Sequence, residues 1–496
     1  MSTILRGAGT AALGSTLLQV TTLLYSIPVV RLLGPEKYGV IGLVNTLIAA
    51  IAPLALVGMG PALSYYLPRV YSPRDVPGVK AVVFSSVRIV TISSMCLLAG
   101  TVLFACLGAR AVFNSTDVSR ILLLLSVSIP LSSLAQLCEG FLRGTKHAAS
   151  VFRVRLSGAA ARLLTVPLVL WVSRGDILLM ALCLVASNGV SLFFGVREFF
   201  GKVLPWRSWR RQSGTPSYTR HLLSFSWPIM VSQYVQVVGK KADVILIAHF
   251  LTNSHVGIYR PAVIISQLLW FVPQALTFLL FPVMNELLGE GKRQDFFAVT
   301  QRTMKCVLYA NLPLAVVLAV LASNILSLLY GSNFVEGCTA LRWLATGATL
   351  QSFYVTSTYI IHSQRRPELW MYTALGGMGT NVFLNILLIP RYGINGAAIA
   401  TACSYVVTTI MAMATAAMLI RKVLFPTSVL GAVVLSATTV GVALFVNGDF
   451  EDNCLLLAGY AVAMAAWLVA FERRDMREAM RLVRNAADRT GAQTEG

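Results

Sequence analysis

Residues 177–197 read ILLMALCLVASNGVSLFFGVR, and the first charge after residue 177 is Arg197. About 20 apolar residues in a helix cross the hydrocarbon core of a bilayer, so this stretch predicts a transmembrane helix. The whole chain has the same character: of its 496 residues, 56% are hydrophobic and 12% charged, with a mean hydropathy of +0.72. Soluble domains carry about 25% charged residues. The composition therefore excludes a soluble multidomain enzyme and a disordered chain, and it predicts a polytopic membrane protein.

The strongly basic balance also follows from a membrane location. The net charge of +20 would suggest nucleic-acid binding in a soluble protein, but base-reading folds need a soluble domain that this chain lacks. We therefore expect no nucleic-acid partner. The eight cysteines are scattered and form no Cys-x-x-Cys pair, which disfavours a disulfide framework or a zinc site. The N-terminus lacks a convincing signal-peptide cleavage site.

Apolar runs of spanning length recur along the chain and predict about 14 transmembrane helices. They lie near residues 9–31, 38–62, 81–108, 119–141, 150–173 and 177–197, then 222–250, 256–284, 304–330, 337–361, 370–390 and 395–420, and finally 425–446 and 454–471. The seventh run is interrupted at Gly239–Asp243, which makes its continuity the weakest of these predictions.

The positive charges give these spans an orientation. With the N-terminus inside, 28 of the 40 lysines and arginines fall in inner segments, 7 in outer segments and 5 within spans. Cytoplasmic loops carry this excess in membrane proteins, so both termini are expected to be cytoplasmic in a cell inner (plasma) membrane. No outer loop is longer than roughly 15 residues, whereas membrane glycan polymerases and ligases usually need a larger outer region for their catalytic carboxylates.

A weak internal repeat divides the spans into two groups of six. Leu33 and Gly39 align with Leu251 and Gly257 at a shift of 218 residues, and Gly158 aligns with Gly377 at 219. Chance matching of apolar sequence is the alternative. A repeat of six spans predicts two lobes related by an axis along the membrane normal. The expected parts are a first lobe at 1–217, a second lobe at 218–422, two extra spans at 423–472 and a basic cytoplasmic tail at 473–496.

Several short motifs carry a family resemblance. They are RLLGPEKYG at 31–39, FSWP at 225–228 followed by Asp243, VGIY at 256–259, LYG at 329–331 and IPRYGINGAAIAT at 389–401. Over about residues 5–420 the chain resembles polysaccharide flippases of the multidrug/oligosaccharidyl-lipid/polysaccharide exporter superfamily. The resemblance implies an all-α, two-lobed, MATE-like V-shaped transporter that moves lipid-linked sugar by alternating access. The two extra spans fit the polysaccharide and lipid-precursor branches.

Polar stripes on two spans are candidates for the wall of a cavity. Ser132, Gln136, Glu139 and Arg143 share one helical face, although Glu139 and Arg143 could simply form a salt bridge that locks the helices together. A second stripe comprises Ser226, Gln233, Gln236, Lys240 and Asp243. Here Lys240 and Asp243 could neutralise each other. The repeat places Gln351 over Ser132, which adds one amide to the candidates.

Cations outnumber acids inside the predicted spans. Arg155 and Arg162 lie seven residues apart on one helical face, and Arg260 lies one turn into the eighth span. Arg162 and Arg260 have no acidic neighbour in sequence, so we expect these two side chains to meet an anionic substrate, although either could be a structural arginine. A cavity for cationic drugs would instead need buried carboxylates, and Glu139 and Asp243 both have basic neighbours.

Aromatic side chains and basic segments complete the candidates. Stacking on sugar rings or ordinary packing could each explain a group of five aromatic residues, namely Tyr65, Tyr66, Trp270, Tyr354 and Tyr359. The basic inner loop at 202–220 and the tail at 473–489 are expected to contact anionic lipid.

No catalytic motif accompanies these features. The sequence contains no Walker A motif, no His/Cys metal spacing and no Gly-x-Ser-x-Gly nucleophile elbow, so we expect neither an enzyme nor a cofactor nor a metal site.

The sequence therefore predicts a flippase for lipid-linked oligosaccharide or polysaccharide precursor. Its expected partners are a polyprenyl-diphosphate-linked glycan, membrane lipids and glycan-assembly proteins. Arginine suits the diphosphate because its guanidinium is a forked, permanently charged donor. The alternatives are a cation-coupled multidrug exporter or a peptidoglycan-precursor flippase of the same fold, and, in a different class, a membrane glycan polymerase or ligase.

Overall fold

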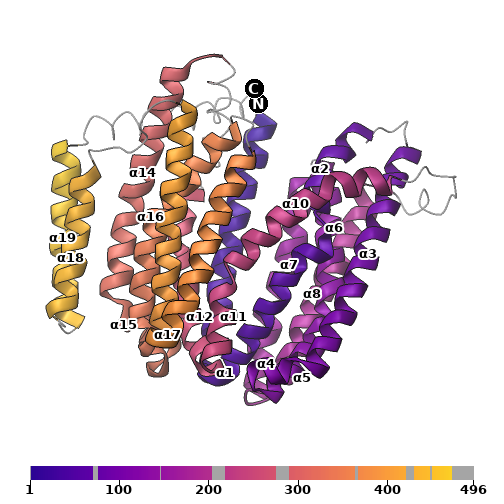
Figure 1. Cartoon of the computed structure of the whole chain (residues 1–496), viewed down its shortest axis with the longest axis horizontal. Coiled ribbons are helices and arrows are strands. Elements are labelled where there is room, and N and C mark those ends of the chain that lie inside the picture. Colours follow the sequence, from indigo (N-terminus) through magenta and orange to yellow (C-terminus); the bar gives the residue numbers. More distant parts are fainter. Residues whose placement is uncertain are drawn as a thin grey trace. The chain divides into compact units, whose positions relative to one another are not determined.

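The computed structural model describes residues 2–70, 76–145, 147–203, 218–274, 287, 290–363, 367–420, 429–446 and 450–471. Within these ranges the secondary structure is entirely helical (Figure 1). Nine of the described helical segments are long and apolar enough to cross a membrane. The chain is therefore an all-α, multi-pass membrane protein, as its composition predicts.

Two of these nine segments each contain two predicted spans. Helix α1 (Ser2–Leu56) bends at Gly34, where φ is 69°, and α17 (Pro367–Ile420) bends at Gly393, where φ is 59°. Glycine has no Cβ atom and adopts positive φ at no steric cost. Each of these two glycines therefore allows the chain to reverse direction without strain. The bends lie between the predicted spans 9–31 and 38–62, and between 370–390 and 395–420. The predicted boundaries there are correct.

Other predicted spans are helical but divided. The second span continues from α1 into α2 (Met59–Val70) through a turn at Val57 and Gly58, which both have positive φ. The fourth is α5 (Thr116–Ser126) followed by α6 (Ser128–Gly144). The seventh is α10 (Thr219–Gly239) followed by α11 (Ala242–Phe250), and it breaks inside the Gly239–Asp243 interruption.

The described parts of the remaining predicted spans are helical, while residues 275–284 and 425–428 of two of these spans lie outside the described residues. The helices are α3 (Val76–Leu107), α7 (Ala148–Val172), α8 (Ile177–Lys202), α12 (Asn253–Ser266) with the 3-10 turn η1 (Gln267–Trp270), α14 (Arg293–Val320) with α15 (Ala322–Tyr330), α16 (Cys338–Ser363), α18 (Leu430–Val446) and α19 (Phe450–Phe471). A short helix, α4 (Ala109–Phe113), and a 3-10 segment, η2 (Ser332–Gly337), lie in connections.

The chain forms two compact units. One comprises residues 13–261 with 385–394, and the other comprises residues 1–12, 262–384 and 395–496. We call them unit A and unit B. The predicted division after residue 217 follows from the sequence repeat and stays a prediction. The predicted tail at 473–496 and most of the basic inner loop lie outside the described residues.

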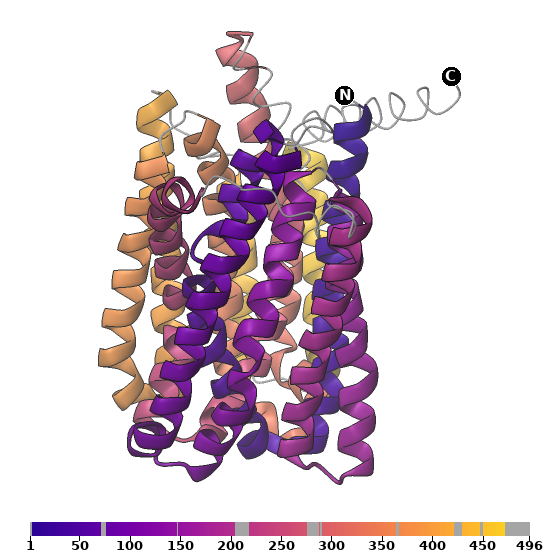
Figure 2. The ribbon, with the colours of Figure 1, turned by 90° about the vertical axis from the view of Figure 1, so that its right-hand side faces the viewer.

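Unit A, whose helices face the viewer in Figure 2, has a core in which α6 packs against α2, α3 and α8. Gly140 and Gly144 of α6 face Leu63 and Leu67 of α2, and a methyl group on Gly144 would overlap the α2 backbone. Small residues thus let these two helices approach closely, as is common between helices in a membrane. The packed helices hold the polar face of α6 in a fixed position.

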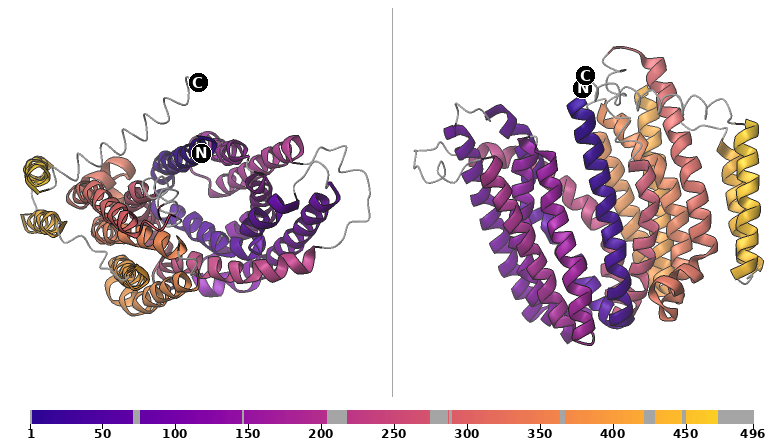
Figure 3. Two further views of the ribbon diagram at one scale, coloured as in Figure 1. Left: turned by 90° about the horizontal axis from the view of Figure 1, so that it is seen from above. Right: turned by 180° about the vertical axis from the view of Figure 1, so that it is seen from behind.

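Unit B is built around α14, α16, α18 and α19. Helices α18 and α19 form a pair, which is seen end on in Figure 3. The Ser436 and Tyr460 hydroxyls lie 2.9 Å apart between them, and the Trp467 ring covers Gly431. The two predicted extra C-terminal spans are therefore a packed helical hairpin.

Equivalent glycines make equivalent contacts in the two units. Gly158 of α7 packs on the Ser191 hydroxyl of α8, and Gly377 packs on the Thr408 hydroxyl within α17. In both cases the glycine meets a hydroxyl of the following span. The shift between the glycines is 219 residues and that between the hydroxyl residues is 217. This agreement supports the sequence repeat.

The bend of α1 and the start of α12 make a reciprocal contact inside unit A. Gly39 lies against the backbone carbonyl of Asn253, and Gly257 lies against the backbone carbonyl of Pro35. The same 218-residue shift relates Pro35 to Asn253 and Gly39 to Gly257. Two contacts that exchange under one shift are what a two-fold relation between the repeats produces. No side chain fits at either glycine.

We predict that Gly39→Ala and Gly257→Ala each destabilise the protein, because the new methyl group must displace a backbone carbonyl. Overpacking of this kind costs about 1–3 kcal/mol, and purified protein in detergent should show a lower thermal unfolding temperature. Gly189→Ala is the matched control, since α8 leaves open space at Gly189. This control should unfold at an unchanged or slightly higher temperature. Equal behaviour of the three variants would contradict the close contact.

Candidate functional site

Arg260 is the best-defined cation of unit A. It lies on α12, and its Nη1 donates hydrogen bonds to the Gly42 carbonyl and, at 2.9 Å, to the Thr46 hydroxyl, both on α1. The guanidinium carbon lies 6.0 Å from the centroid of the Tyr38 ring. These contacts hold the half-buried side chain across α1 and leave most guanidinium donors available.

Arg162 lies on α7. Tyr25 of α1 is within electrostatic range of Arg162, Arg260 and Tyr38. Within the described part of the chain, neither arginine forms an ion pair with a carboxylate. The two arginines that lack an acidic neighbour in the sequence thus both lie within electrostatic range of Tyr25. We call Tyr25, Tyr38, Arg162 and Arg260 the arginine–tyrosine cluster.

Both carboxylate oxygens of Asp243 accept hydrogen bonds within unit A. Its buried carboxylate accepts hydrogen bonds of 2.8 Å from the Tyr259 hydroxyl and from the Val244 amide. It also interacts electrostatically with Lys241 and Arg260. Lys240 lies at the break between α10 and α11, where its side chain is exposed. Tyr259, rather than Lys240, therefore gives Asp243 its side-chain hydrogen bond.

Glu139 binds two arginines on a different part of unit A. Its buried carboxylate accepts a 3.3 Å hydrogen bond from Arg143 on the same helix and a 2.8 Å hydrogen bond from Arg155 on α7. The predicted pairing of Glu139 with Arg143 is correct. The pairing with Arg155 crosses between helices and was not predicted. We call these three residues the Glu139 cluster.

The candidate amides have different surroundings. Gln136 is exposed on α6, whereas Gln233 and Gln236 are partly buried on α10. Gln351 belongs to unit B, where its side chain is buried and its Oε1 lacks a hydrogen-bond partner among the described residues. The side chains of the three candidate amides in unit A are thus at least partly exposed.

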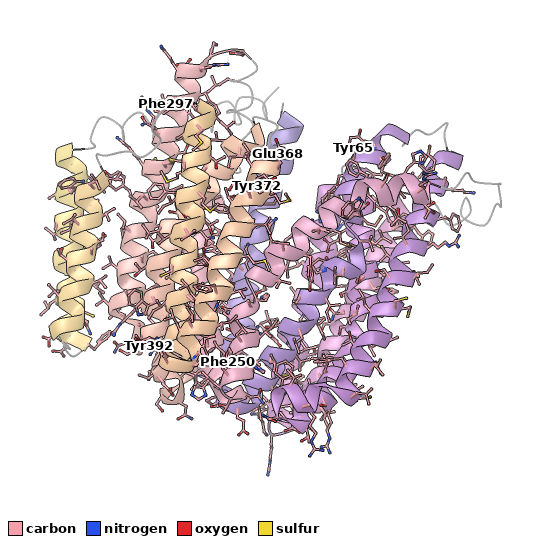
Figure 4. The ribbon with its side chains drawn as sticks, viewed as in Figure 1. Tyr65, Phe250, Phe297, Glu368, Tyr372 and Tyr392 are labelled. Carbon is pink, nitrogen blue, oxygen red and sulfur yellow. The ribbon has the colours of Figure 1, made fainter. Side chains whose placement is uncertain are left out.

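The candidate sugar-stacking aromatics pack against other side chains. Tyr65, labelled on α2 in Figure 4, is exposed and stacks on Phe225 of α10 with the ring centroids 4.7 Å apart. Trp270 packs on Tyr405, and the Tyr354 hydroxyl accepts a 2.9 Å hydrogen bond from Trp370. The Tyr359 side chain lies outside the described part. Tyr65 remains the candidate with an exposed ring.

Metal-binding geometry is not found in the described ranges, where no group of three His, Cys, Asp or Glu side chains could hold an ion. The eight cysteines are free thiols. The polar contacts of the candidate residues in unit A thus involve arginine, tyrosine and hydroxyl groups together with the buried carboxylates of Glu139 and Asp243. Such donors bind anions and sugar hydroxyls.

Known proteins match the chain over most of its length. A family model described as "Polysaccharide biosynthesis protein" matches residues 4–288, and the MatE model matches residues 228–387. A probable low-salt glycan biosynthesis flippase, Agl15 of Haloferax volcanii, is 26% identical over 58% of this chain and 59% of the relative. A probable flippase of the same organism, AglR, is 27% identical over 48% of this chain and 47% of the relative. The chain thus spans about half of these relatives' lengths.

Solved structures share the fold. The lipid II flippase MurJ in an inward closed conformation superposes with a TM-score of 0.73, at 15% identity over 92% of this chain and 98% of the other. An inward-facing MATE-family multidrug resistance transporter gives a TM-score of 0.69, at 16% identity over 82% and 94%. Both proteins belong to the all-α class described above. Because the first family model covers more than half of the residues, this chain belongs to the polysaccharide biosynthesis protein family.

Proposed function

We propose that this protein is a flippase that moves lipid-linked oligosaccharide or polysaccharide precursor across the cytoplasmic membrane by alternating access. The observation that carries the proposal is that Arg162 and Arg260 both lie within electrostatic range of Tyr25 and that neither forms an ion pair with a carboxylate in the described part of the chain. A charged side chain inside a membrane is costly, and such residues commonly line substrate pathways. Two arginines there therefore favour an anionic cargo. The names of the relatives support the same cargo class.

In this proposal the guanidinium groups bind the diphosphate. Thr46 and the Gly42 carbonyl fix one edge of Arg260, and the ring of Tyr38 lies beside it. Held in this way, Arg260 loses little side-chain entropy when it binds phosphate oxygens. In unit A, Gln136, Gln233 and Gln236 would donate to the glycan.

The alternative function is a cation exporter of the same fold, which would need carboxylates that are available to bind a cationic drug. Asp243 is committed to Tyr259 and Val244, and Glu139 to two arginines. A carboxylate with such partners is poorly suited to bind a cationic drug. We therefore propose a transporter rather than an enzyme. Its proposed partners are the lipid-linked glycan, membrane lipids and glycan-assembly proteins.

Arg162→Ala and Arg260→Ala should each lower transport roughly 10- to 100-fold, the effect of losing one or two charge-assisted hydrogen bonds. The assay follows a fluorescent polyprenyl-diphosphate disaccharide in reconstituted vesicles, where flipped lipid is protected from a membrane-impermeant quencher. Arg153→Ala, which removes the ion pair between Arg153 of α7 and Glu198 of α8, is the control and should transport normally. Full transport by both cluster variants would refute the proposal.

Asp243→Asn should keep disaccharide transport within about threefold of wild type, because the amide oxygen can accept from the Val244 amide while the amide nitrogen donates to the Tyr259 hydroxyl oxygen. Asp243→Ala leaves that buried hydroxyl without its acceptor and should unfold at a lower temperature. Vesicles loaded with a cationic dye provide the second arm of the test. Dye extrusion that disappears in Asp243→Asn would show a cation exporter instead.

Single cysteines introduced into a cysteine-free variant should map the proposed orientation. We expect positions 115 and 176 to react with an impermeant maleimide added outside intact cells, and positions 147 and 292 to react only after permeabilisation. The excess of positive charge near the latter positions is the reason. The opposite labelling pattern would place both termini outside.

A further inference from the structure

The Glu139 cluster carries more positive charge than it neutralises. Arg143 Nη2 lies 3.3 Å from Glu139 Oε2, and Arg155 Nη2 lies 2.8 Å from the same oxygen. Two guanidinium groups therefore share one carboxylate. The three side chains together keep a net charge of +1.

A neighbouring ion pair shows that the surplus is particular to this place. Arg153, two residues before Arg155 on α7, pairs with Glu198 at 3.0 Å, one base to one acid. The two acids are similarly withdrawn from solvent, with 15% of the Glu198 side chain exposed and 9% of Glu139. A carboxylate that served only to join two helices would need one arginine, as at Glu198.

The two arginines of the Glu139 cluster remain accessible. Half of the Arg143 side chain and 45% of the Arg155 side chain are exposed, although both contact a buried carboxylate. Each guanidinium has five N–H donors, and the contacts with Glu139 use only some of them. The buried acid thus fixes both forks while their other donors stay open to a ligand.

Resting on the flippase function proposed above, we propose that the Glu139 cluster is a second, separate site that binds the diphosphate of the lipid-linked substrate. Planar guanidinium groups bind phosphate oxygens in a bidentate manner, and two forks fixed by one acid suit two linked phosphates. Exposed Gln136, one turn before Glu139 on the same helical face, adds an amide for the first sugar.

The position of the cluster suggests that it receives the substrate before the arginine–tyrosine cluster does. Arg143 lies in the last turn of α6, and Arg155 lies two turns into α7, at the end that the charges predict to be cytoplasmic. Arg162 follows Arg155 by seven residues on the same face, a rise of about 10 Å. A diphosphate leaving Arg155 therefore meets Arg162 next along α7.

The test isolates the second site by removing the first. Arg162→Ala/Arg260→Ala protein should still bind farnesyl diphosphate at one site in a calorimetric titration. Adding Arg143→Ala/Arg155→Ala should weaken this binding at least about tenfold, whereas adding Arg153→Ala should leave it unchanged. Glu139→Gln keeps one oxygen that can accept from both guanidinium groups and removes the competing negative charge, so this variant should bind farnesyl diphosphate more tightly. Unchanged affinity without Arg143 and Arg155, or lost affinity in Glu139→Gln, would overturn the proposal.

Other phosphate sources are separate arms of the same titration. Inorganic pyrophosphate should bind more weakly than farnesyl diphosphate, and phosphatidylglycerol micelles should not compete. Equal binding of pyrophosphate would show a site for free phosphate, and competition by phosphatidylglycerol would show a site for bulk lipid. Should the alanine variant fail to fold, Arg143→Lys/Arg155→Lys keeps both charges and should still bind less tightly, since it loses the forks.

Transport kinetics distinguish failure of this site from failure of the flippase proposal. In otherwise wild-type protein, Arg143→Ala/Arg155→Ala should raise the KM for the disaccharide lipid about tenfold and leave the maximal rate unchanged, as loss of a receiving site requires. An equal fall in maximal rate would overturn the receiving role. No transport by any variant or by wild type would refute the flippase while the titration still decides the site.

Discussion

A bilayer offers no hydrogen bond to a peptide group, and this constraint decides where the chain can bend and where polar side chains can lie. The helices turn at glycines with positive φ, such as Gly34 and Gly393. Buried hydroxyls donate hydrogen bonds to backbone carbonyls of their own helix, as Ser86 does to Val82 and Ser133 does to Ile129. Because most small polar groups are satisfied locally, the few side chains that reach another helix are informative.

Three of the side chains that bond another helix in unit A belong to the candidate sites. Arg260 binds α1, Asp243 accepts from Tyr259, and Glu139 joins α6 to α7. Each of these contacts between helices gives a charged group a polar partner, which lowers the cost of placing the charge in hydrocarbon. The two arginine clusters differ because Glu139 forms ion pairs with both arginines of one, whereas in the other Arg260 bonds a hydroxyl and a carbonyl oxygen and Asp243 acts on it without an ion pair.

Hydropathy and glycine positions sufficed to predict the spans, since both depend on local sequence. The interruption at Gly239–Asp243 likewise marked the break between α10 and α11. The site could be predicted only in part. Absence of a nearby acid selected Arg162 and Arg260, but nothing in the sequence connects them with Tyr25, because that meeting depends on how α1, α7 and α12 pack. Similarly, the approach of Arg155 to Glu139 requires the turn between α6 and α7.

The reciprocal contact at Gly39 and Gly257 limits how the two halves of this sequence can diverge. Four positions, Pro35, Gly39, Asn253 and Gly257, contribute to one pair of interlocking contacts. The spacing from carbonyl to glycine is four residues in both copies. An insertion in either turn would displace a glycine from one contact and a carbonyl from the other. Natural variants should therefore preserve both spacings together, even where the surrounding repeat has become unrecognisable.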